Sequence, residues 1–388
     1  MIAVSPRNVA ILGATGSIGR NTLEVIAASG GKLRAVALSV CSRLEEGVEL
    51  AARCGASYLA AADADRALRH DWSKLPSTTR RLIGPDAVAE VASLPEVDIV
   101  VAAIVGQAGL RGTWAALEAG KRVALANKET LVVAGQLVME LAAQRKATLL
   151  PVDSEHSAVF QALQSGQPRE VHKIILTASG GPFRRHTAEE LSRVTVAEAL
   201  AHPTWNMGRK ITVDSATMMN KALEIIEARW LFDLAPEQIE VVVHPQSIVH
   251  SMVEFVDGST VAQLGPPDMK LPIQYALTWP DRVPGVAPRM DWSQRHRLEF
   301  EPADLDRFPA LALGFEVARA GGTSGAVLNA ANEIAVERFL AGELPFHQIV
   351  PACRAVLENH TFESHPSLDE LLRQDGWARQ ETAQWICC

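Results

Sequence analysis

Short apolar runs separated by helix-length stretches recur through the first 150 residues. The run 9–12 leads into the glycine turn GATGSIG (13–19) and then into the helical pattern NTLEVIAAS. Further strands of this kind are predicted at 35–38, 58–61, 99–104, 123–126 and 149–152. Strands that alternate with helices form a parallel sheet covered by those helices. The pattern predicts a Rossmann-like, doubly wound parallel sheet over residues 1–150.

A different pattern follows between residues 151 and 278. After a predicted strand at 173–177, alternating apolar and polar residues predict strands at 240–244, 248–256 and 259–264. The Asp257-Gly258 pair between the last two is typical of a hairpin turn. We expect a central α/β catalytic domain with a mixed or antiparallel sheet. Two histidines of these strands are expected to be structural, His244 and His250.

The last part of the chain predicts a linker and then helices. Residues 279–308 begin with a stretch rich in Pro, Arg and Asp, which is typical of an irregular connection. Residues 309–388 are expected to form a C-terminal helical domain. Its helices are predicted at 309–318, 326–340, 346–357 and 367–372. We expect Asn329, Asn332 and Glu333 on the surface of their helix, without a catalytic role.

The richest group of polar side chains lies in HPTWNMGRKITVDSATMMNKALEIIEARW, residues 202–230. Residues 216–230 lack Pro and Gly and have apolar residues at helical spacing, so a helix is predicted with Asp214 and Ser215 as candidate N-caps. Ser215 would then offer a hydroxyl and helix-start N–H groups to a phosphate, with Lys221 further along. For any single residue a solvated helix flank is the alternative. A stripe beside the apolar face carries Asn220, Glu224 and Glu227.

Composition narrows the classes of partner. With 388 residues, of which 48% are apolar, the chain is long enough for two or three domains. A net charge of −8 and a pI near 5.8 argue against nucleic acid and anionic membranes as partners, so a small ligand is expected. The five cysteines lack metal-site spacing, which indicates a reducing compartment. We expect a cytoplasmic protein, because no leader or membrane-length apolar run is evident.

The glycine turn predicts a dinucleotide site. Gly13 allows the tight turn, Gly16 lets the backbone approach a pyrophosphate, and Gly19 permits close packing of the helix. An NAD site has an acid at the end of the second strand, whereas this chain reads SVCSR there. Ser42 and Arg43 therefore favour the 2′-phosphate of NADP. An ordinary surface turn with an unrelated arginine is the alternative.

Asn127-Lys128-Glu129 follows the predicted strand at 123–126. This is the sheet edge where such folds bind ligands, so the nicotinamide ring is expected near these three residues. Lysines at strand ends are usually solvated. The apolar residues on either side of this one make full exposure unfavourable.

A second group of acids predicts a metal site. If the strand at 149–152 continues, alternation places Asp153 and Glu155 on one side. With Glu224 they form an all-oxygen ligand set suited to Mg²⁺ or Mn²⁺. The alternative is that Asp153 and Ser154 only cap a helix, although capping and metal binding are compatible. His156 is more often hydrogen-bonded or exposed at such a position than a ligand.

Two further segments favour binding of a phosphorylated ligand. The glycines of ASGGP (178–182) expose backbone N–H groups near the Ser179 hydroxyl. The loop 202–208 contains Trp205 and Met207 between a proline and a glycine, with no helical or strand period. We predict a lid over the bound ligand, because Trp205 and Met207 have no obvious core to enter and the loop lies a few residues before Ser215. Local anchoring by Trp205 is the alternative.

Taken together, these motifs closely resemble the 1-deoxy-D-xylulose 5-phosphate reductoisomerase family. They are GATGSIG, NKE, DSEHSA, ASGGPF, HPTWNMGRKITVDSATMMNKALE and HPQSIVHSM, in that order. The resemblance implies NADPH- and divalent-metal-dependent rearrangement and reduction of 1-deoxy-D-xylulose 5-phosphate to 2-C-methyl-D-erythritol 4-phosphate, in non-mevalonate isoprenoid synthesis. The implied cation is Mn²⁺, Mg²⁺ or Co²⁺, and the implied assembly is a homodimer.

The resemblance also implies roles for individual residues. Lys128, Asp153, Glu155 and Glu224 are expected to be catalytic, the three acids as metal ligands. The NADPH contacts would be Thr15, Gly16, Ser17, Ile18, Asn127, Glu129 and Gly208, with Ser42 and Arg43 near the 2′-phosphate. The phosphate of the substrate would meet Ser179, His202, Ser215, Asn220 and Lys221. The rest of the substrate would contact Lys128, Ser154, Glu155, Trp205 and Glu224.

One stretch departs from the family pattern. After the second strand the family commonly has Gly, a basic or polar residue and Asn, whereas this chain has Cys41, Ser42 and Arg43. The sequence does not choose between carbon–carbon cleavage with rejoining and a direct shift. Two other classes are weighed against this assignment. A different metal-dependent NADP oxidoreductase would not need the phosphate pocket, and a catalytically silent nucleotide sensor would not need three metal-binding acids.

Overall fold

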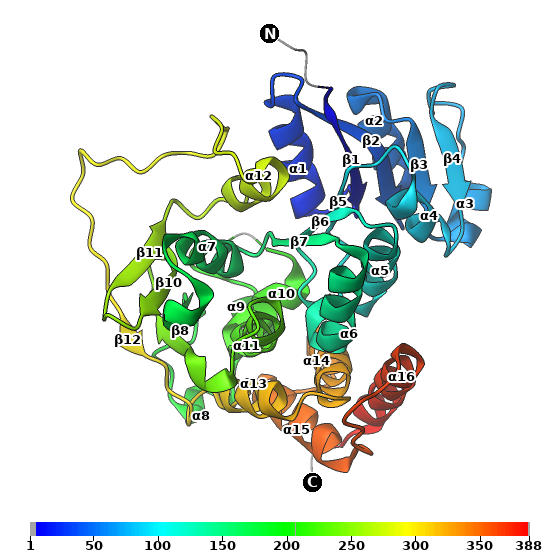
Figure 1. Cartoon of the computed structure of the whole chain (residues 1–388). Helices are drawn as coiled ribbons and strands as arrows, with labels where there is room; N and C mark the ends of the chain where they lie inside the picture. The colour runs from blue at the N-terminus through cyan, green and yellow to red at the C-terminus, as the bar shows by residue number, and fades with distance from the viewer. Residues whose placement is uncertain (1–4, 206, 387–388) are drawn as a thin grey trace. The chain divides into compact units, whose positions relative to one another are not determined.

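The computed structural model describes residues 5–205 and 207–386, coloured from blue to red along the chain in Figure 1. The chain divides into two compact units. Unit 1 comprises Met1–Thr130, Val138–Ser157 and Asp268–Pro288, and unit 2 comprises Leu131–Leu137, Ala158–Pro267 and Arg289–Cys388. The four-part division expected from the sequence, with boundaries after residues 150, 278 and 308, stays a prediction.

Unit 1 is built on a seven-stranded sheet in the order β4-β3-β2-β1-β5-β6-β7. Its strands are β1 (Arg7–Leu12), β2 (Leu33–Val40), β3 (Tyr58–Ala61), β4 (Arg80–Ile83), β5 (Ile99–Ala102), β6 (Arg122–Leu125) and β7 (Thr148–Pro151). All neighbouring strands are parallel, which confirms the doubly wound sheet. The added strand β4 has two exposed arginines, so its sequence lacks the apolar run of a buried strand.

Most helices of this part of the chain connect strands of the sheet, as the sequence pattern predicts, whereas the last two follow its final strand. The helices are α1 (Ser17–Ala27), α2 (Leu44–Cys54), α3 (Ala64–Arg69), α4 (Ala87–Ser93), α5 (Leu110–Glu118), α6 (Glu129–Arg145), α7 (Ser154–Ala162) and α12 (Lys270–Thr278), with a 3₁₀ turn η1 (Gln107–Gly109). Within unit 1, α1 packs against α12 and α4 against α5. The strand β1 has β2 on one side and β5 on the other. Ligands bind such sheets at this reversal of strand order.

Unit 2 contains a five-stranded sheet in the order β11-β10-β8-β9-β12. Its strands are β8 (Val171–Ala178), β9 (Ile239–Val243), β10 (Val249–Phe255), β11 (Thr260–Leu264) and β12 (Glu301–Pro302). The pair β8/β9 is parallel and the other pairs are antiparallel, so the predicted mixed sheet is confirmed. The hairpin turn also forms between β10 and β11, with Gly258 at φ +85°.

Helices make up the rest of unit 2. They are α8 (Ala188–Leu191), α9 (Val196–Ala199), α10 (Arg209–Thr217), α11 (Met219–Leu231), α13 (Pro309–Ala320), α14 (Ser324–Ala341), α15 (Ile349–Asn359) and α16 (Leu368–Gln384), with 3₁₀ turns η2 (Leu163–Ser165), η3 (Pro168–Glu170), η4 (Pro236–Gln238) and η5 (Phe346–Gln348). The helix α14 packs against α10, α13, α15 and α16, and α11 packs against α13. No helix in the described residues combines the length and apolar character that a membrane crossing needs.

Candidate active site

The glycine turn after β1 forms a tight bend at the reversal of strand order. Gly13 has φ +84°, and a Cβ atom there would lie 2.7 Å from the carbonyl oxygen of Ala103, so both the conformation and the space require glycine. Its N–H donates to Ser39 Oγ at 3.0 Å. The helix α1 begins at Ser17, so the first-turn N–H groups lie at Ser17 and Ile18. This arrangement suits the pyrophosphate of a dinucleotide.

An open groove of about 900 Å³ lies beside the end of β2. Ser42 and Arg43, the residues predicted to meet a 2′-phosphate, are both exposed there. Arg43 Nη1 lies 3.4 Å from Glu46, and Arg20 Nη2 lies 2.6 Å from the same carboxylate. Sequence reasoning missed two further cations of this groove, because no short motif connects them to the glycine turn. They are Arg66 and Arg69. The same groove is also lined by five acids, and Arg66 Nε is paired with one of them, Asp63, at 3.0 Å; the acids are Glu45, Glu46, Glu49, Asp63 and Asp65.

Asn127, Lys128 and Glu129 follow β6 and are buried, so the expectation that Lys128 is not fully solvated is confirmed. Asn127 Nδ2 donates to the carbonyl oxygen of Gly106 at 3.1 Å and to Glu129 Oε2 at 2.9 Å. Its Oδ1 accepts from the N–H and the hydroxyl of Thr130 at 3.1 and 2.5 Å. The three residues are therefore held in fixed positions at the edge of the sheet.

Lys128 also holds the first of the predicted metal-binding acids. Its Nζ lies 2.5 Å from Asp153 Oδ2, with both side chains largely buried. Burial would raise the pKa of Asp153, but the charges of Lys128 and His156 lower this pKa below its usual range. Ser154 Oγ donates to Glu155 Oε2 at 2.6 Å. Unit 1 thus presents two adjacent carboxylates, one of them kept ionised by a lysine.

Strand alternation does not place these acids, so that part of the sequence prediction is wrong. The strand β7 ends at Pro151, before Asp153, and Glu155 already lies in the first turn of α7. Ser157 N–H donates to the carbonyl oxygen of Asp153 at 2.8 Å, as in the opening turn of a helix. Asp153 therefore sits where the chain changes from strand to helix. Two carboxylates can flank one space there as readily as on one face of a strand.

In unit 2, the predicted single helix over 216–230 is two helices. Met218 between them has φ +62°, and α10 extends back to Arg209. Asp214 and Ser215 consequently lie inside α10, so the expectation that they are N-caps is wrong. The helix start suited to an anion belongs to α11, and its first turn carries Asn220 and Lys221.

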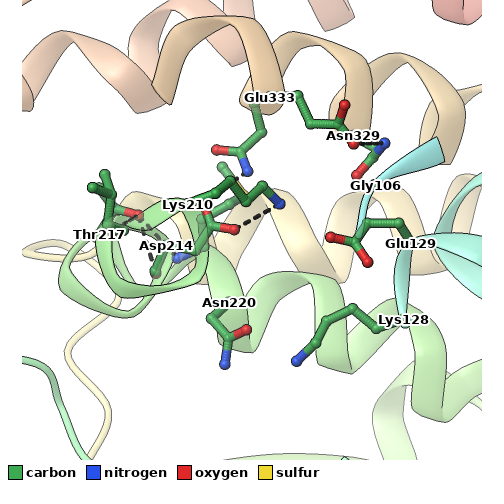
Figure 2. A network of polar contacts seen from close by, with 12 residues as sticks. Gly106, Lys128, Glu129, Lys210, Asp214, Thr217, Asn220, Asn329 and Glu333 are labelled. Atoms are coloured by element: carbon green, nitrogen blue, oxygen red, sulfur yellow. Dashed lines mark hydrogen bonds and ion pairs between the residues drawn. The ribbon is translucent and has the colours of Figure 1, made fainter. Parts of the chain in front are cut away.

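Glu224 lies one turn into α11 and is fully buried. Asn220 Nδ2 donates to its Oε1 at 2.5 Å, and Lys221 Nζ forms a close ion pair with its Oε2. Figure 2 shows Asn220 below α10, where Lys210 and Asp214 form a second ion pair. In the predicted stripe Glu224 and Glu227 are buried and Asn220 is half-buried, so the solvated alternative is wrong for Glu224.

The loop after β8 adds a third polar group to unit 2. Ser179 Oγ lies 3.0 Å from His202 Nε2 and accepts from the N–H of Gly181 at 3.2 Å. The N–H groups of Thr204 and Trp205 donate to His202 Nδ1 at 3.1 and 2.9 Å. The histidine proton is therefore assigned to Nε2, which donates to the serine. Burial lowers the pKa of His202, which favours this neutral form.

The predicted lid, residues 202–208, includes Asn206, which lies outside the described residues. Of its other members, Gly208 is the N-cap of α10. The ring of Trp205 is half-buried, with its centroid 6.3 Å from that of His250. His250 is itself buried, as is His244, whose Nδ1 lies 2.8 Å from the carbonyl oxygen of Glu299. The lid stays a prediction.

A doubly wound sheet with a glycine turn at the reversal of strand order is the architecture of dinucleotide-binding oxidoreductases. Three family models refine this class. The model described as 1-deoxy-D-xylulose 5-phosphate reductoisomerase matches residues 9–135, the C-terminal domain model of that name matches 149–232, and the DXP reductoisomerase C-terminal domain model matches 264–381. The chain belongs to the 1-deoxy-D-xylulose 5-phosphate reductoisomerase family.

Relatives and solved structures agree over nearly the whole chain. The reductoisomerase of Pelotomaculum thermopropionicum is 53% identical, covering 96% of this chain and 97% of the relative. That of Nitrosospira multiformis is 49% identical over 100% of both. The Zymomonas mobilis enzyme in complex with NADPH is 43% identical with a TM-score of 0.90, covering 97% of this chain and 98% of that one. A DOX-P reductoisomerase in complex with NADPH, fosmidomycin and magnesium is 42% identical with a TM-score of 0.91 and covers 97% of each chain.

Proposed function

We infer that this chain is an NADP-dependent oxidoreductase that rearranges and reduces 1-deoxy-D-xylulose 5-phosphate to 2-C-methyl-D-erythritol 4-phosphate. The reaction requires NADPH and a divalent cation, and belongs to isoprenoid precursor synthesis. The observation that carries this function is the agreement of relatives about half identical over almost the full length, such as the Pelotomaculum enzyme at 53%. The buried carboxylate pair and the polar start of α11 supply the groups that the chemistry needs.

We propose that Asp153, Glu155 and Glu224 hold the cation. Carboxylate oxygens are the hard ligands that Mg²⁺ and Mn²⁺ prefer, and the lysine beside Asp153 keeps that acid ionised at neutral pH. When bound, such a cation acts as a Lewis acid toward substrate oxygen atoms. The ammonium group of Lys128 and the hydroxyl of Ser154 then orient the hydroxylated carbons of the substrate.

NADPH is proposed to lie along the glycine turn. Thr15, Gly16, Ser17 and Ile18 would contact the pyrophosphate, since the start of α1 offers backbone N–H groups there. Ser42 and Arg43 would receive the 2′-phosphate, because the groove beside them is open and no acid ends β2. At the nicotinamide end we place Asn127 and Glu129, fixed by their mutual hydrogen bond, together with Gly208.

The phosphate of the substrate is proposed to bind among the polar groups of unit 2. Ser215, Asn220 and Lys221 contribute a hydroxyl, an amide and an ammonium group around the start of α11. Ser179 contributes a second hydroxyl, and the neutral ring of His202 assists by orienting this hydroxyl through their hydrogen bond. Binding of a phosphate remote from the reacting carbons supplies energy for orientation. Trp205 would cover the reacting end.

One experiment separates this function from the two rival classes. Purified protein is mixed with 1-deoxy-D-xylulose 5-phosphate, NADPH and Mn²⁺, and nicotinamide absorbance is followed with and without a chelator. Oxidation that needs the sugar phosphate and stops with the chelator supports the proposal. Oxidation with other sugars but not this one would indicate a different metal-dependent oxidoreductase, and binding of NADPH without turnover would indicate a nucleotide sensor.

Three further attributes are proposed: the choice of cation, the assembly and the location in the cell. We expect Mn²⁺ to serve as well as Mg²⁺ or Co²⁺, because the donor set is all oxygen. We expect a homodimer, with the hairpin strands of unit 2 as its surface. The cytoplasmic location follows only from the cysteine usage and stays a prediction.

A further inference from the structure

Asp214 is a buried carboxylate that none of the roles proposed above uses. It lies in α10 directly before Ser215 and is 1% exposed. Lys210 Nζ lies 2.7 Å from its Oδ2, and Asn332 Nδ2 donates to its Oδ1 at 2.9 Å. Each carboxylate oxygen therefore has its own donor. The second donor comes from α14, 118 residues further along the chain.

The donor Asn332 is fully buried, and so is Asn329 one turn before it. The expectation that these asparagines lie on a helix surface is therefore wrong. The cause is that α14 is packed on several sides by α10, α13, α15 and α16, so even its polar positions are enclosed. A buried amide group is costly unless it is hydrogen-bonded. Asn332 Nδ2 has its acceptor in Asp214, whereas the Oδ1 atoms of Asn329 and Asn332 are buried without a hydrogen-bond partner, so the bond to Asp214 is what holds the Asn332 amide.

The helix that carries Asn332 is also tied to α16. Arg379 of α16 donates through Nη2 to Glu333 Oε2 at 2.7 Å and through Nε to Asp375 Oδ2 at 2.7 Å. Asn329 Nδ2 donates to Glu333 Oε1 at 3.0 Å, and Figure 2 shows these two residues on α14. The amide of Asn332 is thus presented to α10 by a helix that ion pairs hold in place.

The orientation of α10 decides where the Ser215 hydroxyl lies. The loop that carries Ser179 approaches α10 at this residue, since a Cβ atom on Gly181 would lie 2.7 Å from the carbonyl oxygen of Ser215. Gly181 has φ +63°. A small rotation of α10 would therefore move Ser215 relative to Ser179. The hydrogen bond between Asp214 and Asn332 opposes such a rotation.

We propose that Asn332 is a positioning residue for the phosphate of the substrate, acting through Asp214 on Ser215. This inference rests on the proposed function, because it assigns the phosphate to the Ser215 region. Asn332 touches neither substrate nor cofactor in this role. Its loss lowers the affinity for the phosphate and leaves the chemistry at the other end of the substrate unchanged.

The test compares two substrates in the variant Asn332→Leu, which keeps the side-chain size but removes the donor. The KM for 1-deoxy-D-xylulose 5-phosphate is expected to rise about tenfold or more, because Asp214 Oδ1 is left buried without its donor and α10 shifts. The kcat should change less than about threefold. With unphosphorylated 1-deoxy-D-xylulose, kcat/KM should stay within about threefold of the wild type, because this substrate has no phosphate group whose binding the variant could weaken.

A matched control is available in the same helix. Asn329→Leu also removes a fully buried amide, but the partner of that amide is Glu333 and not Asp214. It should lower the melting temperature as Asn332→Leu does, with no change in the preference for the phosphorylated substrate. If the two variants change that preference equally, or neither changes it, Asn332 has only a structural role and the proposal is wrong.

A second pair of variants keeps the test valid if Asn332→Leu does not fold. Asn332→Asp places two carboxylates side by side and should lose the phosphate preference, whereas Asp214→Asn combined with Asn332→Asp restores a donor–acceptor pair and should regain it. Failure of the double variant to regain it overturns the proposal. Wild-type turnover is measured first, so an inactive wild type counts against the proposed function, and an unchanged preference in an active series counts against Asn332.

Discussion

At the scale of single residues, three enclosed acids of the described chain each have a cation or an amide next to them. Asp153 has Lys128, Glu224 has Lys221 and Asn220, and Asp214 has Lys210 with Asn332. A buried carboxylate without such a partner would become protonated. Lys128 lowers the pKa of Asp153 and keeps this acid ionised where a metal ion is proposed to bind.

The first prediction concerns the acids proposed as metal ligands. Glu155→Gln keeps the size of the side chain and the acceptor for Ser154 but removes one negative charge. Loss of an outer-shell partner of a metal already costs about 10–100-fold in affinity or activity, so Mn²⁺ affinity and turnover should fall at least that far. Asp153→Asn and Glu224→Gln should behave alike. Titration with Mn²⁺ by electron paramagnetic resonance measures the affinity directly.

The matched control for that series is Glu118→Gln, an exposed acid at the end of α5. It should leave both metal affinity and turnover unchanged. Normal activity of any of the three ligand variants at limiting Mn²⁺ would remove that residue from the proposed ligand set.

The second prediction concerns cofactor choice. Arg43 is exposed beside an open groove and is only loosely paired with Glu46 at 3.4 Å, so it remains able to bind an anion. Arg43→Ala should raise the KM for NADPH about tenfold, the usual scale for one hydrogen bond to a charged group, and leave that for NADH almost unchanged. Steady-state kinetics with both cofactors measures this.

The control for this prediction is Arg53→Ala, which changes an exposed arginine in the last turn of α2. Equal effects of Arg43→Ala on the two cofactors would show that Arg43 does not meet the 2′-phosphate.

The third prediction concerns His250, whose pKa burial lowers from 6.5 to about 4. The folded state favours the neutral ring, so protonation of His250 destabilises the fold. The contribution of the neutral ring to the free energy of unfolding is therefore complete above pH 6.5 and is lost as the pH falls toward 4. The loss should reach about 3 kcal/mol at most, from 1.36 kcal/mol per pKa unit. Urea unfolding at pH 7 and pH 4.5 should show a smaller pH dependence for His250→Gln than for the wild type. His365→Gln, at an exposed position, should not change it.

At the scale of elements, apolar periodicity predicted most of the fold because buried parallel strands consist almost wholly of apolar residues. The strand 58–61 was predicted to the residue, whereas β4 was missed because its arginines face solvent. The break at Met218 could not be predicted, since methionine is a good helix former and only tertiary packing holds it at positive φ. Tertiary packing, which the local sequence does not encode, is also why Ser215 was wrongly expected at a helix start and Asn332 on a surface.

The same limit applies to the candidate site. Its residues were named from motifs, yet their polar partners depend on contacts between distant segments that no local pattern encodes. Lys128 and Asp153 are separated along the chain by all of α6 and β7. Asn332 reaches α10 across an even longer interval. Periodicity reports which face of an element is apolar, but not which neighbour covers its polar positions.

The fourth prediction concerns the loop 202–208 as an element. Trp205 is half-buried beside His250 in a segment without regular secondary structure, and the loop is expected to close when ligands bind. Chymotrypsin cleavage after Trp205 should be suppressed when NADPH, Mn²⁺ and a phosphonate analogue of the substrate are present together. Cleavage after Trp292, which is exposed in the 279–308 linker, should be unaffected and serves as the internal control. Equal cutting after Trp205 with and without ligands would exclude a lid.

At the scale of the whole molecule, the last prediction concerns the homodimer. The strand β11 is an edge strand of the unit 2 sheet, and none of its residues is fully buried within the chain. Exposed edges of this kind pair with other chains unless they are protected, and β11 carries no proline or charged residue that would protect it.

The face of β11 that points away from the core can be changed by a single substitution. Val261 packs against the core of unit 2, so alternation turns Ala262 to the other face. Ala262→Lys should therefore shift the protein toward the monomer in sedimentation velocity, while Ala52→Lys, at an exposed position of α2 in unit 1, should not. A wild type that sediments as a single chain at assay concentrations would refute the dimer, and a dimeric Ala262→Lys protein would move its surface away from β11.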